Sequence, residues 1–426
     1  MLPHFPRIEK ILGTIEDINI KMLLVEYGSP LFVISERIIS ERCQEFQKAL
    51  QHYYPNSHIA YSVKTNYLPG VLQVMKRFGL WAEVVSGFEY WIARKIGFKP
   101  HEIIFNGPDK KTEDLVRAAR EGVTINADNQ SDIERLGHLT KKSNQVIRMG
   151  IRVNTKIGDI FWNRFGFNLE SGEAYLMIKQ TKKLFPRLVV DGLHIHISSN
   201  VNQSQYYEEA AEKVSDFAIK IQKDFAINTR YLDLGGGFAV PGSRWQNNPI
   251  WVVPTIDEYI INIAKAIKTK MKENQVTLIL EPGRFLIDEA GIFATTVINT
   301  KKASDIQLIN VDSSSHSHLK SVYRRHNIIE AITPEKSSHQ HSMITHIAGN
   351  SCIGYDFLAW ESSLPKLSVG DVLLFYNAGA YTVSRTEQFI HPRPAVVIIR
   401  EDASVNCIRR KERYEDLVHL DKNFIS

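Results

Sequence analysis

The chain has 426 residues, 43% of them hydrophobic and 23% charged, which is the composition of an ordinary globular protein with ample apolar residues for a core. This composition excludes a disordered chain, a collagen and a small disulfide-stapled domain, and the length suggests about two to three domains. The net charge of +5 is mild, and no dense basic run with interleaved aromatic residues predicts binding to nucleic acid.

Cysteine content and the apolar runs point to a reducing compartment. The three cysteines, Cys43, Cys352 and Cys407, form no C-x-x-C pair and leave an odd number, which favours a cytoplasmic protein over a disulfide framework. The N-terminus lacks a basic region followed by an apolar stretch, so no signal peptide is expected. The apolar runs 276–280 and 395–399 are far too short to span a membrane. We expect neither a membrane nor a nucleic acid as partner.

The first structural signal along the chain is a repeated alternation of short β-branched segments with longer amphipathic ones. The predicted strands are 58–63, 81–85, 102–105, 123–127, 146–153, 188–196, 231–234 and 276–280. Helical patterns lie between them, for example at 68–78, 111–121, 206–225 and 256–272. Eight strand–helix repeats predict a parallel (β/α)8 barrel of the TIM type, with a doubly wound sheet as the alternative.

Beyond residue 284 the pattern changes to short strands separated by turns. These strands are predicted at 291–300, 305–311, 343–348, 371–377 and 395–400. Two further β-like segments, 23–26 and 30–34, precede the barrel. We therefore expect a C-terminal β-sandwich or β-barrel domain that also takes in the N-terminal strands. The predicted boundaries are 1–35 for these strands, 36–290 for the barrel and 291–426 for the β domain.

Function in such a barrel gathers at the carboxyl ends of the strands. Lys64 follows the first predicted strand; it is either a solvent-exposed strand end or a lysine enclosed by the barrel, where it could form a Schiff base. His194 and His196 share one face of a strand, as core residues, a metal pair or a ring stacked on a flat cofactor. Two histidines without a third ligand nearby are a weak metal signal, so no metal site is predicted.

Two glycine-containing motifs end the seventh and eighth strands. Gly235, Gly236 and Gly237 form either a plain turn or a nest of backbone amides suited to a phosphate. Glu281-Pro282-Gly283-Arg284 supplies a carboxylate and a guanidinium, which alone would be a surface ion pair. Together, the lysine, phosphate nest, stacking ring, arginine and buried carboxylate describe a site for pyridoxal 5′-phosphate, in which the carboxylate keeps the pyridine nitrogen protonated.

With these motifs the sequence resembles the fold-type III pyridoxal-phosphate decarboxylases, which include the diaminopimelate and ornithine decarboxylases, from Tyr61 to Pro394. The resemblance implies that Lys64 binds the cofactor covalently, that His196 stacks on its ring and that Glu281 pairs with its nitrogen. The residues that it implies around the phosphate and the cofactor are Glu83, Ser199, Gly235, Gly236, Gly237, Pro282, Gly283, Arg284 and Tyr381. Glu83 stands where the family usually has aspartate.

Cys352 matches the family's cysteine that protonates the reacting carbon in the neighbouring subunit's site, so the resemblance implies a head-to-tail homodimer with two shared active sites. On composition alone, a free cysteine is more often a small buried hydrophobe. An inactive regulatory homologue would have lost Lys64 or Cys352, and both are present. An alanine racemase would present arginine to the pyridine nitrogen, which Glu281 argues against.

The departures from the family concern the substrate. In Cys352-Ile353-Gly354-Tyr355-Asp356, Ile353 replaces the acid that binds a distal ammonium, while Asp356 keeps the last position of the motif. Losing that carboxylate would cost roughly a few kcal/mol at a desolvated site. The Arg-Pro-x-Leu-Tyr segment of the diaminopimelate enzymes is also missing, and the sequence that replaces it contains Lys320 and Arg324, either a solvated basic loop or ligands for an anion.

We therefore expect α-decarboxylation of an amino acid whose distal end is anionic or acylated, as in siderophore or related specialised biosynthesis. The alternative is a meso-diaminopimelate decarboxylase of lysine biosynthesis.

Overall fold

The computed structural model describes residues 14–160, 162–240, 253–271, 275–316, 329–333 and 342–422. The chain divides into two compact units. One consists of residues 42–239 and 252–285, and the other of residues 1–41, 240–251 and 286–426. Among the described residues, no helix combines the length and the apolar character needed to cross a membrane.

The first unit is a closed barrel of eight parallel strands. In the order of their pairing the strands are β4 (Ser57–Ser62), β5 (Trp81–Val84), β6 (Ile103–Phe105), β7 (Thr124–Ala127), β8 (Ile147–Asn154), β10 (Leu188–His194), β11 (Tyr231–Asp233) and β12 (Thr277–Leu280). β12 pairs with β4, which closes the ring, and the short β9 (Phe167–Asn168) pairs with β8 outside it. The predicted TIM-type barrel is thus confirmed, with all eight strands where they were expected.

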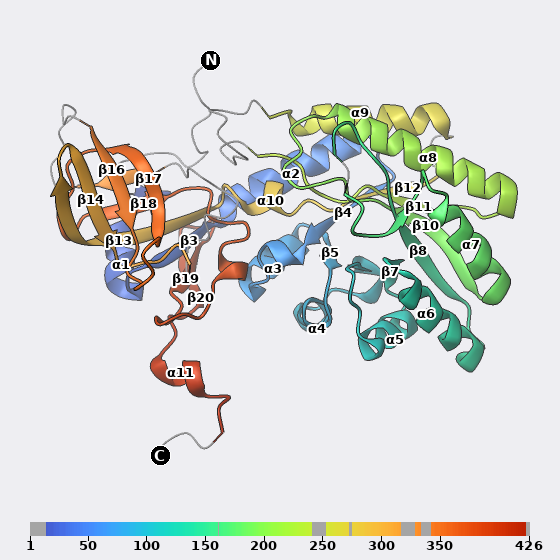
Figure 1. The fold of residues 1–426 in the computed structure, drawn as a ribbon, viewed down its shortest axis with the longest axis horizontal. Helices are drawn as coiled ribbons and strands as arrows, with labels where there is room; N and C mark the ends of the chain where they lie inside the picture. The colour runs from blue at the N-terminus through green and yellow to red at the C-terminus, as the bar shows by residue number, and fades with distance from the viewer. Residues whose placement is uncertain are drawn as a thin grey trace. The chain divides into compact units, whose positions relative to one another are not determined.

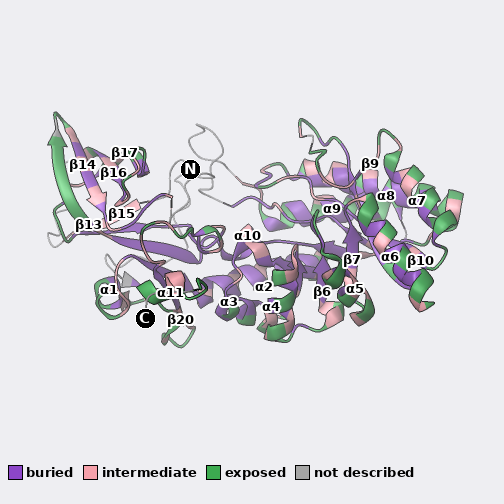
Figure 2. Cartoon of the chain, turned by 60° about the horizontal axis from the view of Figure 1, so that its bottom comes forward, coloured by how far each residue is buried: buried purple, intermediate pink, exposed green. Residues whose placement is uncertain are grey.

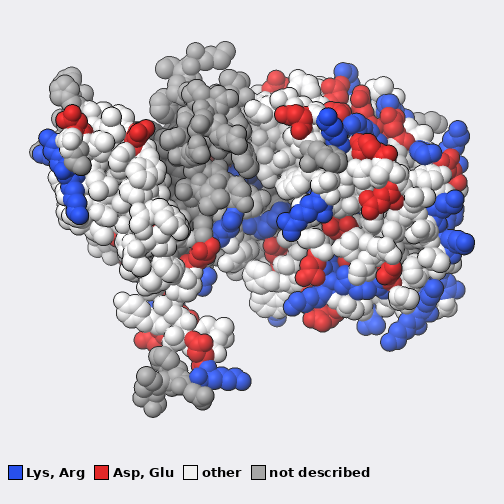
Figure 3. Space-filling view, viewed as in Figure 1, with Lys and Arg blue, Asp and Glu red and all other residues white. Residues whose placement is uncertain are grey.

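Helices alternate with these strands. They are α2 (Glu36–Tyr53), α3 (Pro69–Arg77), α4 (Gly87–Ile96), α5 (Thr112–Glu121), α6 (Gln130–Ser143), α7 (Glu173–Leu184), α8 (Gln205–Phe225) and α9 (Ile256–Lys270). Figure 1 shows the later helices of the series outside the strands, and Figure 2 shows buried strands with exposed residues on the outer helix faces. On the face drawn in Figure 3, acidic and basic side chains are interspersed over this unit.

Local sequence explains where these helices begin. The Asn129 side chain accepts a hydrogen bond from the Asp132 backbone N–H at the start of α6, and Thr255 and Glu258 form a reciprocal capping box on α9. α4 and α5 end at glycines with left-handed backbone, Gly97 and Gly122. These caps satisfy backbone groups that would otherwise lack partners, so each helix stops near its sequence signal.

The second unit is built on a mixed sheet. Its main path runs β17 (Phe357–Leu364), β16 (Met343–Ala348), β14 (Ile306–Val311), β13 (Gly291–Ala303), β3 (Leu31–Ser35), β19 (Ala395–Ile399) and β20 (Val405–Arg409). β18 (Val372–Phe375) pairs with β13 and with β15 (Ile329–Ile332). The remaining elements are β1 (Thr14–Ile15), β2 (Ile18–Asn19), α1 (Ile20–Tyr27), α10 (Arg284–Ile287) and α11 (Tyr414–Val418).

The N-terminal strand β3 lies between β13 and β19, antiparallel to the first and parallel to the second. This pairing confirms that an N-terminal strand joins the C-terminal β domain. The prediction of a strand at 23–26 was wrong, because these residues lie in α1. The Asn19 side chain caps that helix by accepting from the Lys21 backbone N–H, and Gly28 ends it.

Candidate functional site

Lys64 lies directly after β4, in a short 3₁₀ turn (Val63–Thr65), and Glu83 lies on the adjacent strand β5, opposite Ser62 in the register. The Lys64 Nζ is 2.5 Å from the Glu83 Oε2 and 2.5 Å from the Ser62 Oγ. The Ser62 hydroxyl donates to the same Glu83 oxygen at 2.5 Å. Since Glu83 is 1% exposed, the three groups form a closed triangle around a buried carboxylate at the end of the first two strands.

Glu281 follows β12 and is buried in the same end of the barrel. Its Oε1 accepts from the Asn106 amide at 2.6 Å, and its Oε2 lies 3.6 Å from the His194 Nε2. Burial favours the neutral acid, but the contacts with His194, Asp233 and Lys64 outweigh it and hold the pKa of Glu281 well below its usual range. Burial and the negative charge of Glu281 raise the pKa of Asp233 well above its usual value. Glu281 is therefore the ionised member of the pair and Asp233 the protonated one.

His196 lies just past β10, half-buried, with its ring oriented by the glycine turn. The Gly236 backbone N–H donates to the His196 Nδ1 at 3.2 Å. Burial and the nearby cations of Arg152 and Lys64 lower the pKa of His196 to about 3. The ring is thus neutral at physiological pH. The Trp162 ring stands 5.6 Å away, centroid to centroid.

The glycine turn after β11 can be built only from glycine. Gly235 and Gly237 have φ of +68° and +99°. A Cβ on Gly236 would lie 2.1 Å from the Glu281 carbonyl oxygen, and one on Gly237 would lie 2.0 Å from that of Ser198. Such contacts are too close for any side chain, so the turn leaves bare backbone beside His196 and Glu281, as a phosphate-binding nest requires.

The Glu281-Pro282-Gly283-Arg284 segment closes against the loop that carries Lys64. The Ser62 backbone N–H donates to the Pro282 carbonyl at 3.4 Å, and a Cβ on Gly283 would lie 2.1 Å from the Thr65 Oγ1. Arg284 is half-buried at the first position of α10. Ser199 is exposed in the turn after β10. The structure thus brings Lys64, Glu83, His196, the three glycines and Glu281 to one end of the barrel.

The remaining predicted residues belong to the second unit or lie outside the described residues. Cys352 is an exposed free thiol, and Ile353 next to it is half-buried. Tyr381 is half-buried with a φ of +57°. Lys320 and Arg324 lie outside the described residues. The roles given to all of these residues stay predictions.

Asp356 is buried and engaged within its own loop. Its Oδ1 accepts from the Ser315 backbone N–H and hydroxyl, both at 2.8 Å, and its Oδ2 accepts from the Ser351 backbone N–H at 3.1 Å. Burial opposes ionisation, but these hydrogen bonds prevail and lower the pKa of Asp356. In this structure Asp356 therefore organises the Cys352 loop.

Four polar residues that the sequence did not place in the site lie beside it: Asn106, Asn126, Tyr231 and Asp233. Asn106 and Asp233 stand at strand ends, a signal that could have found them. His194 was interpreted first as a core residue, and it is buried beside Glu281. His194, Asp233 and Glu281 together have the composition of a metal site, because their ligand atoms lie within 4.8 Å of one another.

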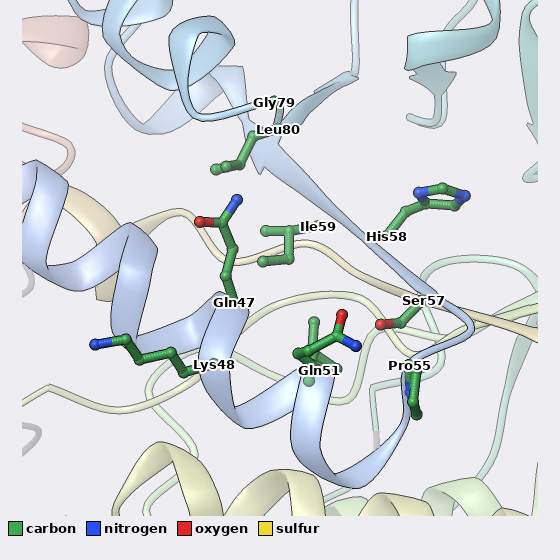
Figure 4. A pocket seen from close by; sticks show the side chains of 10 residues that line it. Gln47, Lys48, Gln51, Pro55, Ser57, His58, Ile59, Gly79 and Leu80 are labelled. Carbon is green, nitrogen blue, oxygen red and sulfur yellow. The ribbon is translucent and has the colours of Figure 1, made fainter.

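A separate hollow of about 400 Å³ lies at the opposite end of β4, where the strand begins (Figure 4). Gln47 and Lys48 of α2 line it together with Ser57, His58 and Ile59. Because the carboxyl ends of parallel barrel strands carry function, we do not assign this hollow to the site.

Comparison with known proteins identifies the class. Residues 36–288 match the family model described as the pyridoxal binding domain of pyridoxal-dependent decarboxylases. The chain belongs to this family, and it is an amino-acid decarboxylase that uses pyridoxal 5′-phosphate.

Among its relatives is the diaminopimelate decarboxylase of Aquifex aeolicus, which is 29% identical over 95% of this chain and 94% of that protein. The diaminopimelate decarboxylase of Methanothermobacter thermautotrophicus is 29% identical over 92% and 91%. The crystal structure of diaminopimelate decarboxylase from Methanocaldococcus jannaschii matches with a TM-score of 0.88 at 25% identity, covering 99% of this chain and 98% of that one.

The residues at the barrel end fit this cofactor. The glycine turn offers backbone amides where a Cβ would clash, and His196 offers a neutral ring beside them. The polar groups are also those that a pyridoxal site requires: Lys64 supplies an amine and Glu281 an ionised carboxylate. Beside Glu281, both ring nitrogens of the buried His194 have no hydrogen-bond partner among the described residues. His194, Asp233 and Glu281 thus have a composition that suits a pyridoxal site as well as a metal site.

Proposed function

We propose that this decarboxylase removes one α-carboxylate of meso-diaminopimelate, which releases carbon dioxide and leaves lysine. The observation that supports this choice of substrate is the similarity, over nearly the whole chain, to proteins named diaminopimelate decarboxylase. One structure of the M. jannaschii enzyme is a complex with L-lysine, the product that this reaction would give. The expected acylated or anionic substrate finds no support in these comparisons, which favour the alternative.

When bound, pyridoxal 5′-phosphate supplies an aldehyde that condenses with an amine and a protonated ring that draws electrons from the reacting carbon. Lys64 would be the residue that holds it covalently. The Ser62 hydroxyl and the Glu83 carboxylate both contact Nζ, and Glu83 can take a proton from it directly or through Ser62. This leaves the neutral amine that a nucleophile requires.

Glu281 would face the ring nitrogen. A carboxylate with a depressed pKa stays ionised at neutral pH and favours a proton on a nitrogen beside it. The neutral His196 would present a flat face without adding charge, in an orientation fixed by the Gly236 amide. Gly235, Gly236 and Gly237 with Ser199, Arg284 and Tyr381 would hold the phosphate.

Cys352 would act from a second subunit and deliver a proton to the carbon from which carbon dioxide departs. Its thiol is exposed in this chain, as a group that reaches into a partner's site must be. If the sites are shared in a homodimer, mixing Lys64→Ala and Cys352→Ala chains would restore activity that neither variant has alone, because mixed dimers contain one complete site.

A second substrate remains a candidate because of one observation. Ile353, half-buried beside Cys352, replaces the acid that would bind the distal ammonium of diaminopimelate or ornithine. An apolar side chain cannot replace that charge, so Ile353 would leave a distal ammonium without a partner, whereas an amino acid with an acylated, uncharged distal end would lose no ion pair there.

The test is carbon dioxide release by the pyridoxal-phosphate-loaded protein from meso-diaminopimelate, ornithine, lysine and a citryl-diaminopropionate conjugate. We expect rapid turnover of meso-diaminopimelate with lysine as the product, and none by the Lys64→Ala protein. Turnover of the conjugate alone would reject the proposed substrate in favour of the second candidate. Release from none of the four would reject both.

A further inference from the structure

Asn106, Asn126 and Tyr231 form a hydrogen-bonded chain inside the barrel, which we call the inner relay. Asn106 follows β6, Asn126 lies on β7 and Tyr231 on β11, so the chain crosses between strands far apart in sequence. Asn106 and Asn126 are 3% and 1% exposed. A buried amide that lacked partners would cost free energy, so each contact of the relay matters for where these groups can point.

The relay has a single direction. The Tyr231 hydroxyl donates to the Asn126 Oδ1 at 2.7 Å, and the Asn126 Nδ2 donates to the Asn106 Oδ1 at 2.9 Å. The Asn106 Nδ2 then donates to the Glu281 Oε1 at 2.6 Å and to the Glu83 Oε1 at 3.3 Å. Ionised carboxylates only accept hydrogen bonds, so Asn106 must turn its NH2 group toward them. The amide oxygen at the other end of the relay, Asn126 Oδ1, must then accept a hydrogen bond.

The Tyr231 hydroxyl is suited to donate that hydrogen bond. Burial, followed by the nearby carboxylates, raises the pKa of Tyr231 well above its usual value, so its hydroxyl remains a donor at physiological pH. Glycines on two other strands make room for its ring. A Cβ on Gly150 would lie 2.2 Å from the Tyr231 hydroxyl, and one on Gly192 would lie 1.9 Å from its Cζ. The tyrosine thus occupies space that only glycine leaves open.

We propose that Asn106 is a positioning residue that holds the Glu83 and Glu281 carboxylates in place for the cofactor, and that Tyr231 and Asn126 fix the direction of its amide. One amide group would thereby link the carboxylate beside Lys64 with the carboxylate expected at the ring nitrogen. Hydrogen bonds to the charged form of a carboxyl group favour that form, so losing the Asn106 amide raises the pKa of Glu281. The inference rests on the cofactor placement proposed above.

The variants that test it are Asn106→Asp and Asn106→Leu. The first keeps the shape of the side chain but directs a carboxylate at Glu281 and Glu83, and the second keeps the volume without any donor. We expect both to bind pyridoxal 5′-phosphate at least about tenfold more weakly. We also expect the visible absorption band of the loaded protein to titrate at least about one pH unit higher than in the wild type.

Tyr231→Phe is expected to weaken cofactor binding by a smaller factor, about threefold, because only the direction of the relay is lost. The matched control is Tyr54→Phe. Tyr54 is a buried tyrosine of the same unit, and its hydroxyl donates to the Val276 carbonyl at 3.0 Å, away from the relay. That variant should bind and titrate like the wild type. Should Asn106→Asp fail to fold, Asn106→Leu and Tyr231→Phe supply the same two measurements.

Wild-type affinity and an unchanged absorption titration in both Asn106 variants would overturn the inference. A loss of affinity with an unchanged titration would also overturn it, since that would be a purely structural effect. The variants Lys64→Ala and Glu281→Gln show whether the relay hypothesis or the proposed position of the cofactor is at fault. If those two proteins bind and absorb like the wild type, the placement is wrong; if they do not and the Asn106 variants do, only the relay is wrong.

Discussion

Glu89 shows how one buried residue near the site sets the pH dependence of stability. It is 7% exposed in α4, and its Oε2 accepts from the Val85 backbone N–H at 2.8 Å. Burial raises the pKa of Glu89 to about 7, although the Lys64 cation opposes the rise. The folded protein therefore keeps a proton that the unfolded chain releases above its ordinary pKa of 4.5. Folding becomes less favourable as the pH rises through this window.

Glu89→Gln should remove this penalty, because the amide can still accept from Val85 and carries no charge. We expect the free energy of unfolding of the variant, relative to the wild type, to rise by up to about 3 kcal/mol between pH 5 and pH 8. Denaturant titrations of the cofactor-free proteins at the two pH values measure it. The exposed Glu113→Gln on α5 is the control, and a Glu89→Gln difference that does not change with pH would contradict the expectation.

Most of the site residues could be predicted from the sequence, but their polar neighbours could not. Lys64, His196 and Glu281 come just after apolar strands and Glu83 lies on one, so strand alternation and barrel closure place them together. Asn106 and Tyr231 are linked through Asn126 only because the barrel closes, and these hydrogen bonds depend on side-chain direction across several strands. A sequence pattern contains no such information. Asp356 shows the same limit, since its partners Ser315 and Ser351 are set by loop geometry.

At the level of secondary-structure elements, a comparison of the turn after β11 with the end of α5 distinguishes steric clash from backbone strain. Gly237 and Gly122 both have positive φ, +99° and +79°, but a Cβ on Gly237 would lie 2.0 Å from the Ser198 carbonyl oxygen, whereas one on Gly122 would have nothing within 4 Å. Both alanine variants incur a backbone cost of about 1 kcal/mol. Only Gly237→Ala also has to displace the backbone beside the expected phosphate.

We therefore expect Gly237→Ala to bind pyridoxal 5′-phosphate at least about tenfold more weakly, and Gly122→Ala to bind it like the wild type while melting at a lower temperature. Fluorescence titration of the cofactor into each apoprotein gives the affinities. Equal affinities of the two variants would show that the turn does not contact the phosphate.

The elements that sequence missed have weak patterns for physical reasons. The 20–27 segment is rich in apolar residues, but only Ile20 and Leu23 are buried, and the caps at Asn19 and Gly28 decide that it is a helix. β17 buries residues at irregular intervals, because its pairing with β16 shifts register, and it therefore lacks the alternation that marks a strand. The barrel strands, enclosed on both faces, give continuous apolar runs and are readily recognised.

On the scale of the whole molecule, the fold and the cofactor follow from the sequence, whereas the substrate does not. The barrel, the β domain with its inserted N-terminal strand and the family all agree with the pattern of strands and strand ends. We predict that the substrate is selected by the Cys352 loop and by the sequence 317–328, which contains Lys320 and Arg324 and lies outside the described residues. The replacement of a single acid by Ile353 favours a substrate without a distal ammonium. The similarity to diaminopimelate decarboxylases favours meso-diaminopimelate.

Covalent binding of the cofactor by Lys64, at the end of β4, can be tested directly. Borohydride reduction of the loaded protein, followed by proteolysis and mass spectrometry, identifies the lysine that carries the phosphopyridoxyl group. We predict that the adduct lies on the peptide containing Lys64 and is absent from Lys110, which is fully buried against Asp132 at 2.8 Å. An adduct on another lysine, or none, would contradict the account.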